Sequence, residues 1–222
     1  GADGAVLATP DGVRVLAARE AGVELPLPGT ERPGTAALAG AYLRLGIDHI
    51  LAGWDHLAFV LCLFLLAARW ALLWLVTAFT VGHSASLALS HFGLLAVPTA
   101  PTEAVIALSI VFMAREALLA TTDTRRVDRR ALAVVVLFGA LHGLGFASVL
   151  GDLGVAGADR VAGLVAFNVG VECGQLLFIA LLAALWTGLR AARLQAPARL
   201  ALLSCAGSFG AWWFAERFAG LL

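Results

Sequence analysis

The stretch LGIDHILAGWDHLAFVLCLFLLAA, residues 45–68, is long and apolar enough to cross a lipid bilayer as a helix. One crossing needs about 20 predominantly apolar residues. The only charged side chains in this stretch are those of Asp48 and Asp55, and both lie in its first half. The stretch therefore predicts a membrane-spanning helix with polar groups near its beginning.

The rest of the chain continues this pattern. Of its 222 residues, 61% are hydrophobic and 14% are charged, and the mean hydropathy of +0.91 is typical of integral membrane proteins. None of the seven prolines interrupts an apolar run, so we expect uninterrupted helices. The sequence predicts an all-α fold, a polytopic membrane helix bundle of about six transmembrane helices. The expected spans are residues 45–68, 71–91, 102–121, 131–150, 160–188 and 198–220.

Arginines are concentrated in alternate loops between these spans. Short loops that are rich in arginine stay on the cytoplasmic side, and arginines mark the first, third and fifth loops. We therefore expect a multi-pass protein of a bacterial-type cytoplasmic membrane, with both termini on the periplasmic side. The arginines concerned are Arg69, Arg125, Arg126, Arg129, Arg130, Arg190, Arg193 and Arg199.

Residues 1–36 are too polar and too rich in proline to enter the bilayer. We expect an extracytoplasmic arm there, with one hairpin at most, followed by a membrane domain at residues 37–222. The arm is too short to form its own core. Because the chain begins at Gly1 without a methionine, we expect that a signal peptide has been removed or that the chain was cut artificially.

Composition argues against two further features. The 15 basic residues are balanced by 15 acidic residues, so we expect no basic surface for nucleic acid. The cysteines Cys62, Cys173 and Cys205 all lie inside apolar runs, which predicts small buried side chains rather than disulfides.

Ionisable side chains within a membrane are costly, so each one requires a partner or a function. His49 and His56 are seven residues apart, which is two helical turns, and they therefore share one helix face with Asp55 beside them. Two imidazoles and a carboxylate are ligands that suit Ni, Co, Zn or Cu. The alternative is that these groups cap the beginning of the helix, but Asp55 and His56 lie too deep in the span for simple capping.

The second and fourth spans contain one histidine each. His83 is followed by Ser84, and His142 lies between Gly139 and Gly143, where small residues allow a neighbouring helix to approach closely. The alternative interpretation of both histidines is a hydrogen-bonded packing residue.

The fifth span carries Glu172, with Asn168 and Gln175 on the same helix face. A carboxylate at this depth is difficult to explain as lipid-facing, so we expect it to contribute to a site. The alternative is a structural network of interhelical hydrogen bonds. Asp48, Ser84, Asn168 and Gln175 are expected to support the site.

Depth connects these positions. Counted at 1.5 Å per residue along the helices, His56, His83, His142 and Glu172 each lie roughly 10 to 18 Å below the outer face. Histidines that only pack would not be expected to share one level. We therefore predict a metal-binding cavity that opens toward the outside, with the ligands His49, Asp55, His56, His83, His142 and Glu172.

These residues resemble those of the HupE/UreJ family, membrane proteins described as nickel permeases attached to hydrogenase and urease maturation. The family's signature of a histidine, five residues and Asp-His is complete at His49, Asp55 and His56, whereas a second family pattern is matched only in part around His142. GHS at residues 82–84, HGLGFA at 142–147 and FNVGVECGQ at 167–175 resemble the second, less characterised branch of the family. The resemblance extends over residues 40–220 and implies uptake of a divalent metal from the extracytoplasmic side.

The predicted function is therefore uptake of a divalent transition metal, with nickel favoured over cobalt or zinc and transport favoured over catalysis. One alternative is an intramembrane zinc hydrolase with Glu172 as the general base, since Arg115, Glu116 and hydroxyls such as Thr77 and Thr80 are almost the only polar groups in the cytoplasmic halves. Another is a metal-binding subunit of a homo-oligomer or larger membrane assembly. The expected partners are the metal ion and the lipid bilayer.

Overall fold

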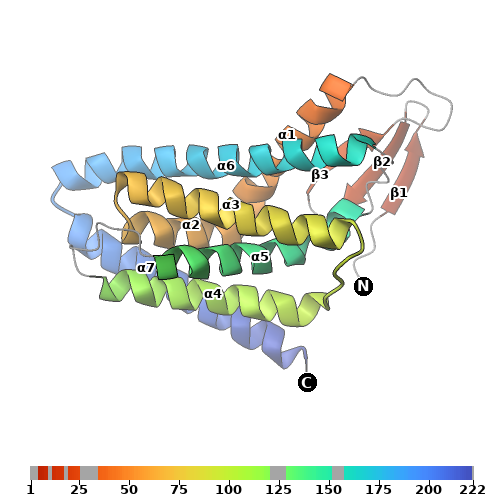
Figure 1. Ribbon diagram of the computed structural model, residues 1–222. Helices are drawn as coiled ribbons and strands as arrows, with labels where there is room; N and C mark the ends of the chain where they lie inside the picture. The colour runs from red at the N-terminus through yellow and green to blue at the C-terminus, as the bar shows by residue number, and fades with distance from the viewer. Residues whose placement is uncertain are drawn as a thin grey trace.

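The computed structural model describes residues 5–9, 12–17, 20–25, 35–120, 129–151 and 158–221. Over these residues the chain forms a bundle of long helices with a small sheet at its N-terminal end (Figure 1). The strands are β1 (Ala5–Thr9), β2 (Gly12–Ala17) and β3 (Glu20–Leu25). The helices are α1 (Thr35–Ala52), α2 (Trp54–Leu66), α3 (Arg69–His91), α4 (Thr99–Leu119), α5 (Arg129–Gly151), α6 (Ala158–Ala191) and α7 (Gln195–Ala219).

The N-terminal sheet has one more strand than the expected hairpin. Its three strands pair in the order β1-β2-β3, and both pairs are antiparallel, with Val15 opposite Val6 on one side and Val23 on the other. Strand β3 lies against α1, which places the sheet beside the beginning of the bundle (Figure 1). The separate arm and membrane domain remain a prediction.

Each of the six expected spans contains a helix, and the expectation of uninterrupted helices is wrong for the first span. Its residues form the end of α1 and all of α2, which meet at Gly53 with a bend of 74°. No proline is involved. Gly53 has an extended conformation (φ −79°, ψ 97°), and its N–H and C=O still bond to His49 and Leu57, so the helical direction changes at one residue.

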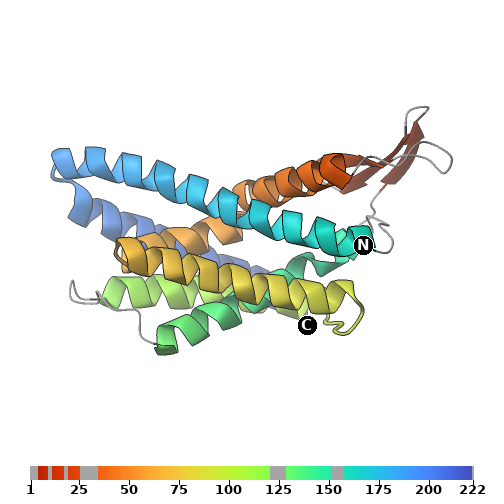
Figure 2. The same ribbon diagram turned by 45° about the horizontal axis from the view of Figure 1, so that its top comes forward.

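Three helix pairs build the bundle, namely α1 with α6, α3 with α5, and α4 with α7 (Figure 2). Glycines allow the two helices of each of the first two pairs to approach closely. Gly82 of α3 lies against the carbonyl of Val136 on α5, and Gly139 of α5 lies against the carbonyl of Phe79 on α3. Because a Cβ atom at either position would collide with backbone, these glycines set the distance between α3 and α5.

Polar contacts near both ends hold α4 against α7. Nε of Arg217 donates to Oε2 of Glu103 at 3.1 Å. Arg199, near the beginning of α7, donates to the carbonyl of Ala117 in the last turn of α4. That carbonyl has no partner within its own helix, so the guanidinium satisfies a helix end that lies inside a membrane protein.

Two helices of the described chain, at residues 70–91 and 161–191, are by length and composition apolar enough to cross a membrane, and the bent pair α1–α2 makes a third if it counts as one span. Six crossings and the sides of the termini remain predictions. The remaining helices agree with the expected spans to within three residues, because prolines and charged residues mark their ends in the sequence.

Candidate metal centre

The break between α1 and α2 positions three of the predicted ligands. His49 lies in the last turn of α1, and Asp55 and His56 lie in the first turn of α2. The bend at Gly53 brings the two histidine rings to a centroid separation of 4.7 Å. A Cβ atom at Gly53 would lie 2.8 Å from Nδ1 of His56 and 2.9 Å from the carbonyl oxygen of His49. This arrangement therefore depends on a residue without a side chain at position 53.

Asp55 determines which nitrogen of His56 is available to a ligand. The ring Nδ1–H donates to Oδ1 of Asp55 at 3.0 Å, and the backbone N–H of His56 donates to the same oxygen at 2.8 Å. With its proton on Nδ1, the ring keeps a lone pair on Nε2, which is buried without a hydrogen-bond partner in the described chain. A carboxylate behind an imidazole is a common way of orienting metal-binding histidines.

His142 of α5 also donates through Nδ1, but to a different partner. Its Nδ1–H donates to the carbonyl of Phe138, one turn earlier, at 2.8 Å. Its Nε2 is buried and has no hydrogen-bond partner among the described residues. The ring centroids of His142 and His56 are 5.0 Å apart, so two imidazoles with the same free nitrogen are neighbours.

His83 of α3 completes the group. Its ring centroid lies 5.8 Å from that of His49 and 5.7 Å from that of His56. The side chain is fully buried, and neither ring nitrogen has a hydrogen-bond partner in the part of the chain that is described. All four histidines are at most 7% exposed. The structure thus brings together imidazoles from four helices, α1, α2, α3 and α5.

The spacing of these rings suits a metal centre. Imidazole nitrogens at about 2.0 Å from a tetrahedral zinc ion place ring centroids roughly 5 Å apart, and the observed separations are 4.7–5.8 Å. As the side chains are placed, however, no group of three or more His, Cys, Asp or Glu residues among the described residues is arranged to hold a metal ion.

Phenylalanines enclose the histidine group, and no sequence pattern marks them as part of a site. Phe59 and Phe79 each pack against His142, and Phe167 packs against His49. All three are fully buried. An apolar wall excludes water from the imidazoles, which strengthens any electrostatic interaction with a bound cation.

Three of the four supporting residues make local contacts instead. Asp48 is half-exposed and lies 3.6 Å from Arg44. Ser84 donates to the carbonyl of Thr80, and Asn168 donates to the carbonyl of Leu164, each one turn earlier on the same helix. No contact to the four histidine rings is shown for these three side chains, and their supporting role remains a prediction.

Glu172 lies in a separate polar group between α3 and α6. Thr77 donates to its Oε1 at 2.7 Å, and Thr80 contacts its Oε2. Thr80 is also 2.9 Å from Oε1 of Gln175, which is fully buried. Because Thr80 precedes His83 by three residues, this group lies about one turn of α3 away from the histidines. In the sequence the two threonines are only hydroxyls in an apolar span, and the packing of α3 against α6 is what brings them to Glu172.

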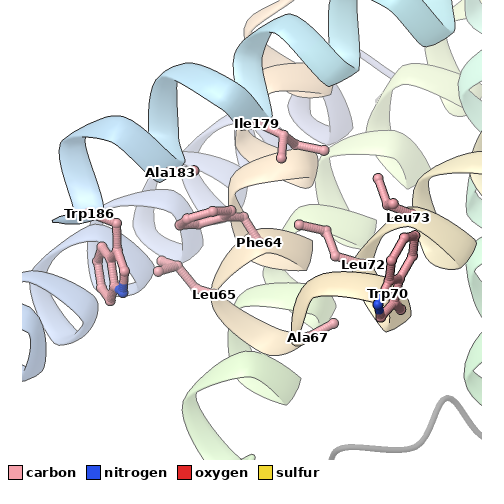
Figure 3. Close-up of a pocket in the computed structure, with 9 residues that line it drawn as sticks. All are labelled: Phe64, Leu65, Ala67, Trp70, Leu72, Leu73, Ile179, Ala183 and Trp186. Atoms are coloured by element: carbon pink, nitrogen blue, oxygen red, sulfur yellow. The ribbon is translucent and has the colours of Figure 1, made fainter.

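A cavity of about 500 Å³ lies elsewhere, among α2, α3 and α6 (Figure 3). None of the predicted ligands lines it. Its side chains are apolar apart from the indole N–H groups of two tryptophans, so it offers no metal ligands. The lining residues are Phe64, Leu65, Ala67, Trp70, Leu72, Leu73, Ile179, Ala183 and Trp186.

Comparison with known proteins adds one match. A family model described as HupE / UreJ protein matches residues 29–217, which is most of the chain. No curated protein and no solved structure matches the sequence.

Proposed function

The chain belongs to the HupE/UreJ family, and from this premise we propose that it takes up a divalent transition metal across the cytoplasmic membrane. The family is associated with nickel and cobalt transport, which supports metal uptake in general. We propose nickel as the substrate, with cobalt or zinc as weaker alternatives, and His49, Asp55, His56, His83 and His142 as its first binding site.

The observation that carries this proposal is the gathering of four buried histidines. Packing alone would not bring together imidazoles from four helices, each within 6 Å of at least one other, because a buried polar ring nitrogen without a partner is costly. A cation that accepts the free Nε2 lone pairs of His56 and His142 would remove that cost. The donor set also matches the preference of nickel and zinc for imidazole.

Asp55 marks the proposed entrance. Its side chain is about one-third exposed (34%), whereas the ring of His56 behind it is almost completely buried (4%). A hydrated cation would meet the carboxylate first, exchange water for carboxylate oxygen, and then pass to the imidazoles. We place this entrance on the periplasmic side, in agreement with the arginine distribution and with six crossings.

The broken helix α1–α2 supports a transport function. Helices that are interrupted in the membrane are typical of transporter binding sites. Here the break at Gly53 lies directly between His49 and His56.

The test is nickel uptake by the full chain reconstituted in liposomes that contain a nickel-sensitive fluorophore. Wild-type protein should fill the liposomes, and His56→Ala should abolish uptake without lowering the melting temperature. His91→Ala, at the end of α3 and outside the group, is the matched control and should transport normally. Empty liposomes with the wild-type protein would overturn the proposal.

The hydrolase alternative needs Glu172 beside a metal-bound water. In the structure this carboxylate is engaged by Thr77 and Thr80, one turn away from His83. No observation on the described residues favours hydrolysis, and it becomes the better hypothesis only if liposomes stay empty while one zinc ion co-purifies with each chain. If neither metal nor flux is found, a role as a subunit of an oligomer or larger assembly becomes the better hypothesis.

A further inference from the structure

The polar group around Glu172 contains only oxygen ligands. It consists of the hydroxyls of Thr77 and Thr80 on α3 and the side chains of Glu172 and Gln175 on α6. Thr80 and Gln175 are buried, Glu172 is half-buried, and Thr77 is exposed on the outer surface of the seam between the two helices.

The hydroxyl of Thr80 has more possible acceptors than it has protons to donate. The hydroxyl of Thr80 lies within hydrogen-bonding distance of Oε2 of Glu172, Oε1 of Gln175 and the carbonyl oxygen of Val76. A hydroxyl has one proton, so it can donate to only one of these three acceptors at a time. The remaining acceptors need another donor or a positive charge.

No positive side chain supplies that charge. Within the described residues, no ion pair involves Glu172, and the titratable group nearest to it along α3 is His83, one turn beyond Thr80. Gln175 also has a polar atom without a partner among the described residues. Its side chain is fully buried, and its Nε2 has no hydrogen-bond partner in the described chain.

We propose that Thr77, Thr80, Glu172 and Gln175 form a second cation site, which receives the divalent metal after it leaves the histidine group. This inference rests on the proposed function. It gives the ion a second position in a part of the bundle where the sequence offers few polar groups besides Thr77 and Thr80. A borderline metal ion binds carboxylate, hydroxyl and amide oxygens less tightly than imidazole, and conduction requires a site weak enough to release the ion.

The first experiment separates binding from flux in the full chain. Glu172→Gln keeps the shape of the side chain and removes its charge. It should retain one tightly bound nickel ion per chain, measured by calorimetry, while nickel uptake into liposomes falls by about tenfold or more because the exit site is lost. Glu116→Gln, an exposed glutamate paired with Arg115, is the matched control and should change neither quantity.

Two results would overturn the proposal. Unchanged uptake by Glu172→Gln would show that the carboxylate is not on the path, and loss of the tightly bound ion would make Glu172 a ligand of the histidine site. If Glu172→Gln does not fold, Thr80→Val decides by the same two criteria, since it removes an oxygen but keeps the side-chain volume.

A second experiment tests this site even if the wild-type protein does not transport nickel. Mn²⁺ prefers oxygen ligands, so the His56→Ala protein should still bind one Mn²⁺ ion weakly, as measured by electron paramagnetic resonance. Adding Glu172→Gln should remove that binding, whereas adding Glu116→Gln should not. Equal Mn²⁺ binding by all three proteins would contradict a site at Glu172, independently of any result on uptake.

Discussion

Single residues determine which atoms of the histidine group are available to a metal ion. His56 and His142 both donate through Nδ1, the first to a carboxylate and the second to a backbone carbonyl. Both rings consequently keep the lone pair on Nε2. The two partners differ in strength, because a hydrogen bond to a carboxylate is roughly twice as strong as one between neutral groups. Asp55 is therefore the stronger of the two positioning groups.

We expect Asp55→Asn to weaken nickel binding by roughly tenfold to a hundredfold, the usual effect of losing the partner behind a metal-binding histidine. The amide is neutral and holds the Nδ1–H of His56 less firmly. Calorimetry on the purified protein measures the dissociation constant, and the melting temperature reports whether the fold is kept. Glu103→Gln, which removes a carboxylate from the α4–α7 contact, should leave nickel affinity unchanged. Wild-type affinity in Asp55→Asn would show that Asp55 does not position the ring.

The sequence predicted one site that contains the four histidines and Glu172, and the structure places Glu172 about one turn of α3 from the histidines. Depth counting predicted that His56, His83, His142 and Glu172 share one level, because helical rise is regular. Depth does not determine which side of its helix pair a residue faces, and Glu172 lies on the α3–α6 seam with Thr77 and Thr80. Its contacts depend on how α6 is rotated against α3, which a single sequence does not specify.

At the scale of helices, the break at Gly53 is the feature that builds the site. An unbroken helix would place His49 and His56 two turns apart, or about 10 Å along the axis. The 74° bend between α1 and α2 reduces the separation of their rings to 4.7 Å. The sequence showed no proline at this point, and glycine alone is a weak signal for a break in a membrane helix. The expectation of a continuous helix was wrong for this reason.

We expect Gly53→Ala to weaken nickel binding by about tenfold or more, because displaced ligands and their partners have effects of this size. The φ and ψ angles of Gly53 are accessible to alanine, so the effect should come from the Cβ atom, which would lie 2.8 Å from Nδ1 of His56. Nickel titration measures the change in affinity, and the melting temperature shows whether the fold is kept.

Gly40→Ala is the matched control for this substitution. Gly40 lies in the same helix, α1, and a Cβ atom there would have no neighbour within 4 Å. The substitution should leave nickel affinity unchanged and raise the free energy of unfolding by at most about 1 kcal/mol, because alanine favours a helix more than glycine does. If both glycine variants bind nickel like the wild type, the site does not depend on the absence of a side chain at the break.

At the scale of the whole molecule, many large apolar side chains lie on the outer surface of the described helices. Large hydrophobic side chains are exposed on α3, α4, α5, α6 and α7, among them Trp74, Leu108, Leu137, Leu181 and Trp212. A water-soluble bundle would not expose apolar residues on so many helices. We propose lipid contact for all of these helices, including α4 and α7, whose charged and polar residues keep them below the composition of a membrane span.

Helix α4 gives the sharpest test of six crossings, because Glu103 near its beginning and Arg115 and Glu116 near its end lower its hydropathy. If α4 crosses, the loop before it and the residue after it lie on opposite sides of the membrane. Ala96→Cys and Ala120→Cys report on these positions in a protein whose Cys62, Cys173 and Cys205 are replaced by alanine. A membrane-impermeant maleimide on intact cells should label position 96, whereas position 120 should react only after permeabilisation.

Other labelling patterns would identify which part of the topology is incorrect. Reaction at both positions in intact cells would mean that α4 does not cross, and the arginine rule would then have no basis for the later loops. Reaction at position 120 alone would mean that the bundle is inverted, so that Asp55 and the histidine group lie nearer the cytoplasm. In that orientation the oxygen site at Glu172 would precede the histidines along the path, and a metal ion would be captured weakly before it is bound tightly. Only the predicted pattern lets an incoming ion meet the imidazoles first and leave through the weaker site.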